Sequence, residues 1–285
     1  MDAVFLFPIY FLEKVCYNTG MLYNAKEGKL NINGEQIDYI TFGKGRKPLV
    51  MIQGLNTRGI KGSALPLAYM YRIFAKEYKV YLFDRRPSIH DGITVRDIAS
   101  DIATAMDTLH LEKADILGVS QGGMIAQYLS IDRPDLVNKL VLVVTLSKNN
   151  ERVKSVIENW ISLTEKGDIK TLVKDMAEKM YSDAYMKRYR PLLPLLTLLQ
   201  KPKDPQRFIL LARSCLTCNV YEELDKIQCP TMVIGGEQDK IVGASASKEL
   251  AQKLGCKLHM YKDLGHAVYE EAKDFNKRVY EFFLA

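Results

Sequence analysis

Apolar and polar positions are grouped in blocks along most of the chain. Continuous apolar runs, which are typical of strands buried on both faces, occur at residues 48–53, 79–83, 114–119, 139–144, 231–235 and 257–261. Segments with the periodicity of amphipathic helices lie between or beyond them, at residues 65–77, 95–109, 121–133, 244–254 and 267–283. This alternation predicts an α/β fold in which helices cover both faces of a parallel sheet.

Two local signals refine the pattern in the first half of the chain. Residues 29–33 and 36–42 are predicted strands joined by Asn33-Gly34, a sequence typical of a tight hairpin turn. Thr94 stands directly before the predicted helix 95–109, where its side chain can cap the first free N–H groups.

The strand–helix rhythm stops between residues 147 and 223. This stretch is helical in pattern, contains no predicted strand, and is rich in Met, Tyr and Leu. We interpret it as an inserted helical cap, which leaves residues 29–146 and 224–285 as the α/β core.

Residues 1–28 are predicted to form an apolar N-terminal extension. The start resembles a weak signal sequence, but Asp2 stands where basic residues are expected and no small-residue cleavage site follows. We expect this segment to pack on the body of the protein or on a second subunit, as in a homodimer. Contact with a membrane interface is the alternative. Because no segment is long enough to span a bilayer, we expect no stable membrane insertion.

Composition and charge exclude some classes of partner. The chain has 285 residues, of which 47% are hydrophobic and 26% charged, as in ordinary globular proteins with a large core. The net charge of +6 comes from scattered Lys and Arg residues. We interpret these as solvated faces, and expect no nucleic-acid partner.

The five cysteines predict reduced thiols in a cytoplasmic protein, because an odd and sparse set does not make a disulfide framework. Cys215 and Cys218 have redox spacing, but no second pair and no neighbouring His accompany them for a metal. We interpret both as small semi-buried residues, and expect no metal site.

A candidate nucleophile lies at the end of the predicted strand 114–119. The sequence there reads Gly118-Val119-Ser120-Gln121-Gly122, and a helical pattern follows. A serine on a sharp strand-to-helix turn has a strained backbone that exposes its hydroxyl, and the flanking glycines, Gly118 and Gly122, avoid clashes with the neighbouring strand and helix. We therefore predict Ser120 as a nucleophile.

A serine nucleophile needs a base and a group that orients the base. The chain has four histidines: His90, His110, His259 and His266. Only His266 combines a loop after the last predicted strand with the order Ser, acid, His. The acid is expected on the loop after strand 231–235, where we predict Asp239; Glu237 is a substitute of lower rank, and the closeness of Asp263 to His266 says little about geometry.

The oxyanion of an acyl intermediate needs two preorganised N–H donors. Gln121, the residue after the nucleophile, supplies one. The loop after strand 48–53 reads Gln53-Gly54-Leu55-Asn56. We predict the Leu55 N–H as the second donor, with Gly54 allowing close approach of the backbone.

These motifs, taken in order, resemble the α/β-hydrolase superfamily in its single-domain, cap-bearing branch. The resemblance covers about residues 29 to 285, and includes Asp84-Arg85-Arg86-Pro87-Ser88 after the strand 79–83. It implies an eight-stranded, mostly parallel sheet flanked by helices, with the helical cap inserted after the sixth strand.

The chain departs from the superfamily's usual pattern at two places. Gln53-Gly54 replaces the usual His-Gly of the oxyanion loop, and we expect Gln53 to support the loop by hydrogen bonding in a different way. Arg86-Pro87-Ser88 lacks the usual glycines, which stiffens one wall and makes His90 a candidate pocket residue.

The predicted function is a serine hydrolase of the carboxylesterase type that needs no metal or organic cofactor. The apolar cap favours a small lipophilic acyl substrate, although such residues are more often core. Acyltransferase, C–C hydrolase, aminopeptidase and cofactor-free perhydrolase activities share the scaffold, and the fold alone does not choose among them. A ligand receptor with very slow or no turnover is the alternative of another class.

Overall fold

The computed structural model describes residues 23–189, 191 and 201–285. Its centre is an eight-stranded sheet in the order β1-β2-β4-β3-β5-β6-β7-β8. The strands are β1 (Lys26–Ile32), β2 (Glu35–Phe42), β3 (Lys47–Ile52), β4 (Tyr78–Phe83), β5 (Ala114–Val119), β6 (Val137–Val143), β7 (Thr231–Gly236) and β8 (Lys257–Tyr261). The pairings of β2 with β1 and β4 are antiparallel, and all others are parallel. The predicted mostly parallel sheet is confirmed.

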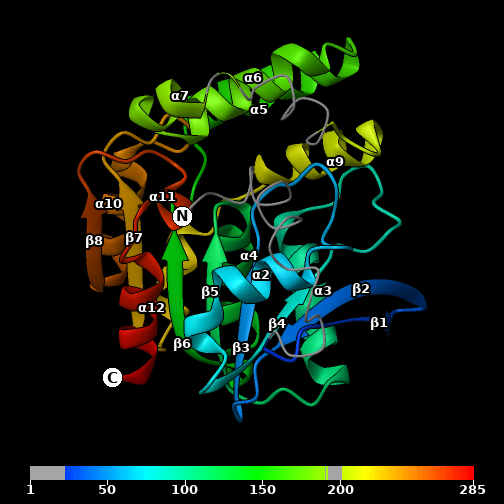
Figure 1. Cartoon of the computed structure of the whole chain (residues 1–285), viewed down its shortest axis with the longest axis vertical. Helices are drawn as coiled ribbons and strands as arrows, with labels where there is room; N and C mark the ends of the chain where they lie inside the picture. The colour runs from blue at the N-terminus through cyan, green and yellow to red at the C-terminus, as the bar shows by residue number, and fades with distance from the viewer. Residues whose placement is uncertain (1–22, 190, 192–200) are drawn as a thin grey trace.

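The central strands β3, β5, β6 and β7 are largely buried on both faces, as their apolar runs predicted. The prediction was wrong for β8, none of whose residues is buried, because β8 lies at the edge of the sheet. In β3, Val50 and Ile52 pack on one face with α3 (Val95–Thr108), α4 (Gln121–Asp132) and α10 (Ala244–Leu254). Leu49 and Met51 pack on the other face, with α2 (Ala64–Met70), the 3₁₀ helix η1 (Arg72–Phe74) and α12 (Phe275–Leu284). Successive side chains of a strand point to opposite faces, so a fully apolar strand contributes to both cores (Figure 1).

Local sequence signals account for two well-defined element boundaries. Ile32 pairs with Glu35, which leaves Asn33 and Gly34 as a two-residue hairpin loop with φ angles of 51° and 85°. Positive φ at both positions is the type I′ geometry that Asn-Gly favours. Thr94 accepts a hydrogen bond from the Asp97 N–H while Asp97 accepts one from the Thr94 N–H, a capping box that starts α3.

The stretch between β6 and β7 forms helices that lie over the carboxyl ends of the parallel strands (Figure 1). We call the described helices of this stretch the cap: α5 (Glu151–Glu165), α6 (Ile169–Met180), α7 (Asp183–Tyr189) and α9 (Pro205–Cys215). Apart from one bridge between Lys148 and Asn219, the described residues of 147–223 contain no strand. The 3₁₀ helix η4 (Tyr221–Lys226) leads back towards β7.

Two predicted helices are shorter than their patterns suggested. The segment 65–77 divides into α2 and η1, and the segment 267–283 divides into α11 (Val268–Glu271) and α12. Ala272 adopts extended backbone between α11 and α12. This break turns Glu271 towards the Ser182 hydroxyl and N–H groups of the cap, while Phe275 enters the core.

The predicted N-terminal extension lies mostly outside the described residues, and Lys26–Gly28 of its predicted range belong to β1. No helix within the described ranges has both the length and the apolar character that crossing a bilayer requires.

Candidate active site

Ser120 joins β5 to α4 in a strained conformation. Its φ of 53° and ψ of −120° lie outside the regions that side-chain-bearing residues normally adopt. The Ser120 N–H donates to the Val143 carbonyl at 2.9 Å, and the Thr145 hydroxyl donates to the Ser120 carbonyl at 2.8 Å. Strand β6 and the residues after it therefore hold the turn in place.

The flanking glycines allow α4 to begin directly against the sheet. A Cβ atom on Gly118 would lie 2.8 Å from the Ala126 Cβ atom, and one on Gly122 would overlap the carbonyl oxygen of Ile52. A larger residue at either position would move the helix away from β5 and β3. The predicted role of both glycines agrees with this geometry.

Ser120, His266 and Asp239 form a continuous hydrogen-bonded line. The His266 Nε2 atom lies 2.9 Å from the Ser120 Oγ atom, and the His266 Nδ1 atom lies 2.8 Å from the Asp239 Oδ2 atom. His266 is 3% exposed and Asp239 is 6% exposed. The structure thus brings together residues that are 27 and 146 positions apart in the sequence, in the arrangement that nucleophile activation requires.

Close backbone contact brings the loops of Asp239 and His266 together. A Cβ atom on Gly236, at the end of β7, would overlap the carbonyl oxygens of Leu264 and Gly265. The Gln238 N–H also donates to the Leu264 carbonyl at 3.0 Å. Glycine at the end of β7 therefore sets the distance between acid and base.

Asp239 is held in its ionised form. Burial alone would raise its pKa, but the hydrogen bond and charge of His266 lower it. Its Oδ1 atom also accepts hydrogen bonds from the N–H groups of Ile241 at 2.8 Å and Val242 at 3.0 Å. The net result is a pKa below the ordinary value for Asp.

The alternative acids lie elsewhere. The Glu237 carboxylate pairs with Lys248 at 2.8 Å, and Asp263 is exposed. Among the other histidines, His90 is exposed, with Nδ1 2.9 Å from the Asp91 carbonyl oxygen. The expectation that His90 lines the pocket receives no support from this position.

The predicted oxyanion donors lie beside the nucleophile. Gln121 is the first residue of α4, so its N–H has no acceptor within the helix. A Cβ atom on Gly54 would lie 3.2 Å from the Ser120 Cβ atom, which shows how closely the loop carrying Leu55 passes. Gln121 and Leu55 thus lie on segments that flank Ser120.

Support for the oxyanion loop differs from the expectation. The side-chain amide nitrogen of Gln53 is buried and makes no hydrogen bond to any described residue. Its backbone carbonyl instead accepts a hydrogen bond from Arg85 Nη2 at 2.7 Å. The loop is therefore supported through its backbone by Arg85, and not by the Gln53 amide.

The side chain of Gln121 contacts the cap, a role that sequence reasoning missed. Its Nε2 atom donates to the Leu211 carbonyl at 2.8 Å and to the Ser214 Oγ atom at 3.1 Å, both in α9. No local signal pointed to this contact, because its partners in α9 are 90 to 94 residues away in the sequence.

The cysteine pair and the metal-ligating residue types among the described residues offer no second catalytic site. Cys215 and Cys218 are buried free thiols, and burial raises the pKa of Cys215 to about 12, so neither is a reactive thiolate. Across residues 23–189, 191 and 201–285, no group of three His, Cys, Asp or Glu side chains is placed to hold a metal ion.

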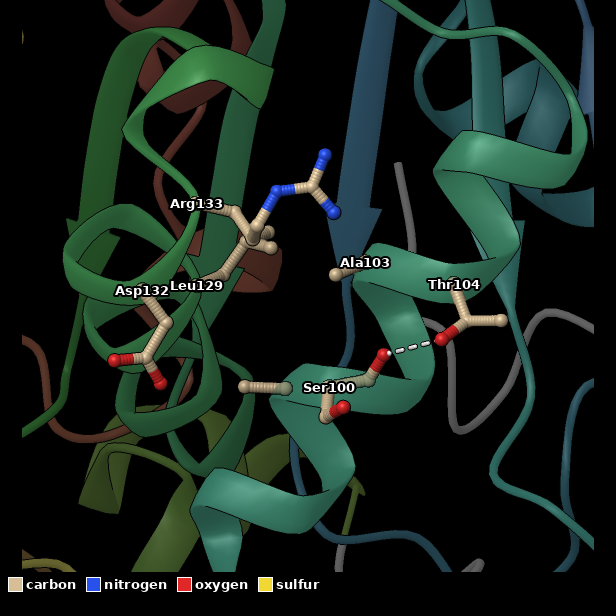
Figure 2. A pocket seen from close by; sticks show the side chains of 7 residues that line it. Ser100, Ala103, Thr104, Leu129, Asp132 and Arg133 are labelled. Carbon is tan, nitrogen blue, oxygen red and sulfur yellow. Dashed lines mark hydrogen bonds between the residues drawn. The ribbon is translucent and has the colours of Figure 1, made fainter. Parts of the chain in front are cut away.

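A cavity of about 230 Å³ lies between α3 and α4, beside the end of α4 that is remote from Ser120 (Figure 2). It is lined by Ala99, Ser100, Ala103, Thr104, Leu129, Asp132 and Arg133. Asp132 pairs with Arg96, and Arg133 pairs with Asp107 and Asp135. Its charged groups are therefore already neutralised within the protein.

Comparison with known proteins gives one family. A family model described as alpha/beta hydrolase fold matches residues 47–273. RutD of Rhizobium rhizogenes, provisionally named a carbamate hydrolase, is 25% identical over 240 residues, covering 80% of this chain and 90% of RutD. The 2-hydroxy-6-oxononadienedioate/2-hydroxy-6-oxononatrienedioate hydrolase 2 of Pseudomonas putida is 28% identical over 271 residues, covering 90% and 93% of the two chains.

The enol-lactonase from Burkholderia xenovorans LB400 has a similar structure, with a TM-score of 0.80 and 20% sequence identity. The alignment covers 90% of this chain and 100% of that chain. At this level of identity the similarity shows the shared fold.

Proposed function

Because the chain belongs to the alpha/beta hydrolase fold family, we propose that it is a serine hydrolase acting on an acyl bond through Ser120, His266 and Asp239. The observation that carries the proposal is the unbroken line of hydrogen bonds, 2.8 Å from Asp239 to His266 and 2.9 Å from His266 to Ser120. Hydrogen-bond contact between nucleophile, base and orienting acid is the geometric signature of an activated serine.

In the proposed reaction, Ser120 Oγ attacks the acyl carbonyl carbon while His266 Nε2 accepts the hydroxyl proton. The N–H groups of Gln121 and Leu55 stabilise the negative charge that forms on the carbonyl oxygen. Collapse of the tetrahedral intermediate breaks the bond to the leaving group, which takes the proton from His266. Water, deprotonated by His266, then attacks the acyl-enzyme and releases the acid and free Ser120. These steps need no metal or organic cofactor.

An ester or lactone is the substrate bond that we place first, in the manner of a carboxylesterase. The support for a lipophilic acyl group is weaker than the composition of the cap suggested. Trp160 and Met176 are buried in the core, so their apolar character serves packing and is no evidence for a lipophilic substrate. Most of the Leu-rich segment after Pro191 lies outside the described residues.

Hydrolysis of a C–C bond is the second candidate. The relative from Pseudomonas putida, which aligns with 90% of this chain, is named for hydrolysis of 2-hydroxy-6-oxononadienedioate. That substrate has no ester bond, so its hydrolysis cleaves a carbon–carbon bond. Turnover of such a vinylogous diketone acid in preference to esters would favour this candidate.

The test is covalent labelling by a fluorophosphonate probe, with wild type, Ser120→Ala and Ser130→Ala compared. Ser130 is a matched control because it lies in the same α4 helix, buried, with its hydroxyl donating to the Ala126 carbonyl. We expect labelling of the wild type and of Ser130→Ala, and none of Ser120→Ala. A p-nitrophenyl ester series from acetate to decanoate then sizes the acyl pocket. A folded wild type that does not react with the probe would contradict the proposal and favour a ligand receptor.

A further inference from the structure

We propose that Arg85 is a positioning residue for the oxyanion hole, because its single buried guanidinium contacts both segments that carry the oxyanion donors. This inference rests on the proposed function. Arg85 follows β4 by two residues and is 4% exposed. Its Nη2 atom donates to the Gln53 carbonyl at 2.7 Å and to the Gln121 Oε1 atom at 3.4 Å.

The first contact acts on the loop that carries Leu55. Gln53 is two residues before Leu55, and Gly54 between them has no side chain to limit its backbone. A hydrogen bond from a cation to the Gln53 carbonyl restrains the orientation of this peptide segment. The direction of the Leu55 N–H therefore depends on Arg85.

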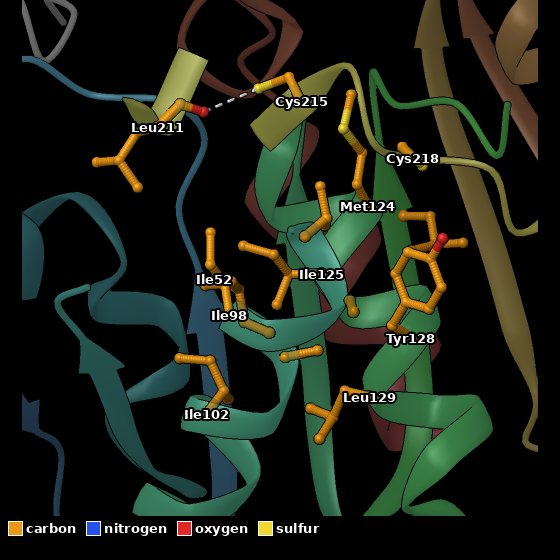
Figure 3. Close-up of a cluster of buried hydrophobic side chains, with 14 of the residues drawn as sticks. Ile52, Ile98, Ile102, Met124, Ile125, Tyr128, Leu129, Leu211, Cys215 and Cys218 are labelled. Carbon is orange, nitrogen blue, oxygen red and sulfur yellow. Dashed lines mark hydrogen bonds between the residues drawn. The ribbon is translucent and has the colours of Figure 1, made fainter. Parts of the chain in front are cut away.

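The second contact acts on Gln121. Its amide oxygen accepts from Arg85, while its amide nitrogen donates to Leu211, Ser214 and, at 3.3 Å, to the Cys215 Sγ atom. Figure 3 shows Leu211 and Cys215 of α9 near the Met124 end of α4. Both the oxygen and the nitrogen of the Gln121 amide are thus hydrogen-bonded. Through them, the first residue of α4 is joined to Arg85 after β4 and to α9 of the cap.

Within residues 23–189, 191 and 201–285, no carboxylate forms a hydrogen bond or ion pair with the guanidinium. Its Nε and Nη1 atoms make no hydrogen bond within the described residues, and both are closed to solvent, as is the Gln53 amide nitrogen. No substrate group can reach atoms enclosed in this way, which argues against an anion-binding subsite. The Asp84 carboxylate accepts hydrogen bonds from the N–H groups of Ile60 and Arg85, and pairs with Arg207 at 3.7 Å.

Burial lowers the pKa of Arg85 to about 10, so the side chain remains a cation at neutral pH. The nearby charges of Asp84 and Asp101 offset the burial of this cation only in part, so the cation is unfavourable in the resting state. Negative charge on the bound oxyanion compensates it only as the reaction proceeds. Arg85 therefore stabilises the tetrahedral intermediate more than it stabilises bound substrate, which is the condition for a higher kcat.

The experiment compares Arg85→Met and Arg85→Lys with the wild type. The readouts are kcat and KM for p-nitrophenyl butyrate, the rate constant for fluorophosphonate labelling of Ser120, and the Tm. We expect Arg85→Met to lower kcat and the labelling rate constant about 10- to 100-fold, with KM changed by less than about threefold. The Tm should change little, because removal of the buried charge offsets the loss of the hydrogen bonds to Gln53 and Gln121. Arg85→Lys keeps the charge and should recover part of kcat.

A second variant, Gln121→Met, removes the other partner of the Arg85–Gln121 hydrogen bond. Its matched control is Gln127→Met. Gln127 is a buried glutamine of the same helix, and its amide nitrogen donates to the Gly123 and Leu146 carbonyls. We expect Gln121→Met to lower kcat, and the double variant Arg85→Met/Gln121→Met to lose less than the product of the two single losses. Gln127→Met should keep the kcat of the wild type even where it lowers the Tm.

Each contrary outcome has a distinct meaning. An unchanged labelling rate constant and kcat in Arg85→Met, with the wild type labelled, would overturn the role of Arg85 alone. A lower Tm with an unchanged kcat, normalised to the concentration of Ser120 that the probe labels, would also overturn that role, because it indicates a purely structural residue. A change in KM without a change in kcat would overturn it as well. A wild type that is not labelled would overturn the proposed function, and the role of Arg85 with it.

Discussion

At the scale of single residues, the strained backbone of Ser120 is stabilised by hydrogen bonds from its neighbours. A non-glycine residue at positive φ is unfavourable by roughly 1–3 kcal/mol, and persists only where its surroundings dictate it. Here the Ser120 carbonyl accepts hydrogen bonds from the Gly123 N–H at 2.8 Å and from the Thr145 hydroxyl at 2.8 Å. The turn is therefore stabilised by α4 and by the end of β6, and the hydroxyl is presented to His266.

Replacing the acid tests the proposed division of roles. We expect Asp239→Asn to lower kcat for a p-nitrophenyl ester roughly 10³- to 10⁴-fold, because the amide no longer holds the imidazole in its reactive tautomer. Glu237→Gln, two residues away and paired with Lys248, is the control and should stay within about twofold of wild type. A large loss in Glu237→Gln with little loss in Asp239→Asn would show that Glu237, and not Asp239, is the acid.

The depressed pKa of Asp239 also predicts a pH dependence of stability. A carboxyl whose pKa is lower in the folded protein adds stability above its unfolded pKa of about 3.9, and loses it as the pH falls through the folded value. Urea unfolding should therefore show a difference between wild type and Asp239→Asn that narrows as the pH falls below about 4. A difference that stays constant below pH 4 would contradict the lowered pKa.

At the scale of elements, the start of α4 depends on the absence of side chains. Gly122 faces the carbonyl oxygen of Ile52, and Gly123 faces Thr145, whose Cβ atom would lie 2.6 Å from an added Cβ. The helix packs against β3 and β6 more closely than any larger residue allows. This close packing places the Gln121 N–H next to the loop of Gly54.

Gly122→Ala separates this steric requirement from glycine's effect on backbone freedom. In an open helix the change would stabilise by up to about 1 kcal/mol, but here we expect a loss of about 1–3 kcal/mol from overpacking, with loss of activity. Gly34→Ala is the contrast, because its φ is +85° and nothing lies within 4 Å; it should cost about 1 kcal/mol and leave kcat unchanged. Urea unfolding and ester turnover measure both, and a stabilised, active Gly122→Ala would contradict the packing argument.

At the scale of the whole molecule, Arg207 joins the cap to the core. From α9 it donates to the backbone carbonyls of Arg85 at 3.0 Å and of Arg86, and pairs with Asp84 at 3.7 Å. Asp84 in turn accepts from the Ile60 N–H at 3.1 Å. The cap is therefore joined to the segment after β3 by two routes: one runs through Arg207 and Asp84 to Ile60, and the other runs through the Gln121 amide and Arg85 to Gln53.

Arg207→Met should loosen this junction. Because several hydrogen bonds to partly buried carbonyls are lost together, we expect the free energy of unfolding to fall by about 1–3 kcal/mol and amide hydrogen exchange in α9 to become faster. Arg213→Met, in the same helix with an exposed ion pair to Glu165 at 3.2 Å, should change stability by less than about 0.5 kcal/mol. Equal effects of the two variants would show that Arg207 has no special role in holding the cap.

The sequence by itself determined the elements and the identity of the candidate site residues. Apolar runs and helical periodicity are properties of neighbouring residues, so the predicted bounds of α10 and β8 agree with the structure. Four histidines and one Gly-x-Ser-x-Gly motif made His266 and Ser120 identifiable before any geometry was known. The division of the chain at residues 147 and 223 remains a prediction.

Only the tertiary structure decided which polar groups meet. Arg85 and Gln121 are 36 residues apart, and Gln121 and Cys215 are 94 apart, so no local pattern could pair them. The break between α11 and α12 is likewise set from a distance, by Ser182 of the cap and the core that receives Phe275. Local periodicity depends on adjacent residues alone, whereas the support of the oxyanion loop depends on how the sheet edge and the cap pack together.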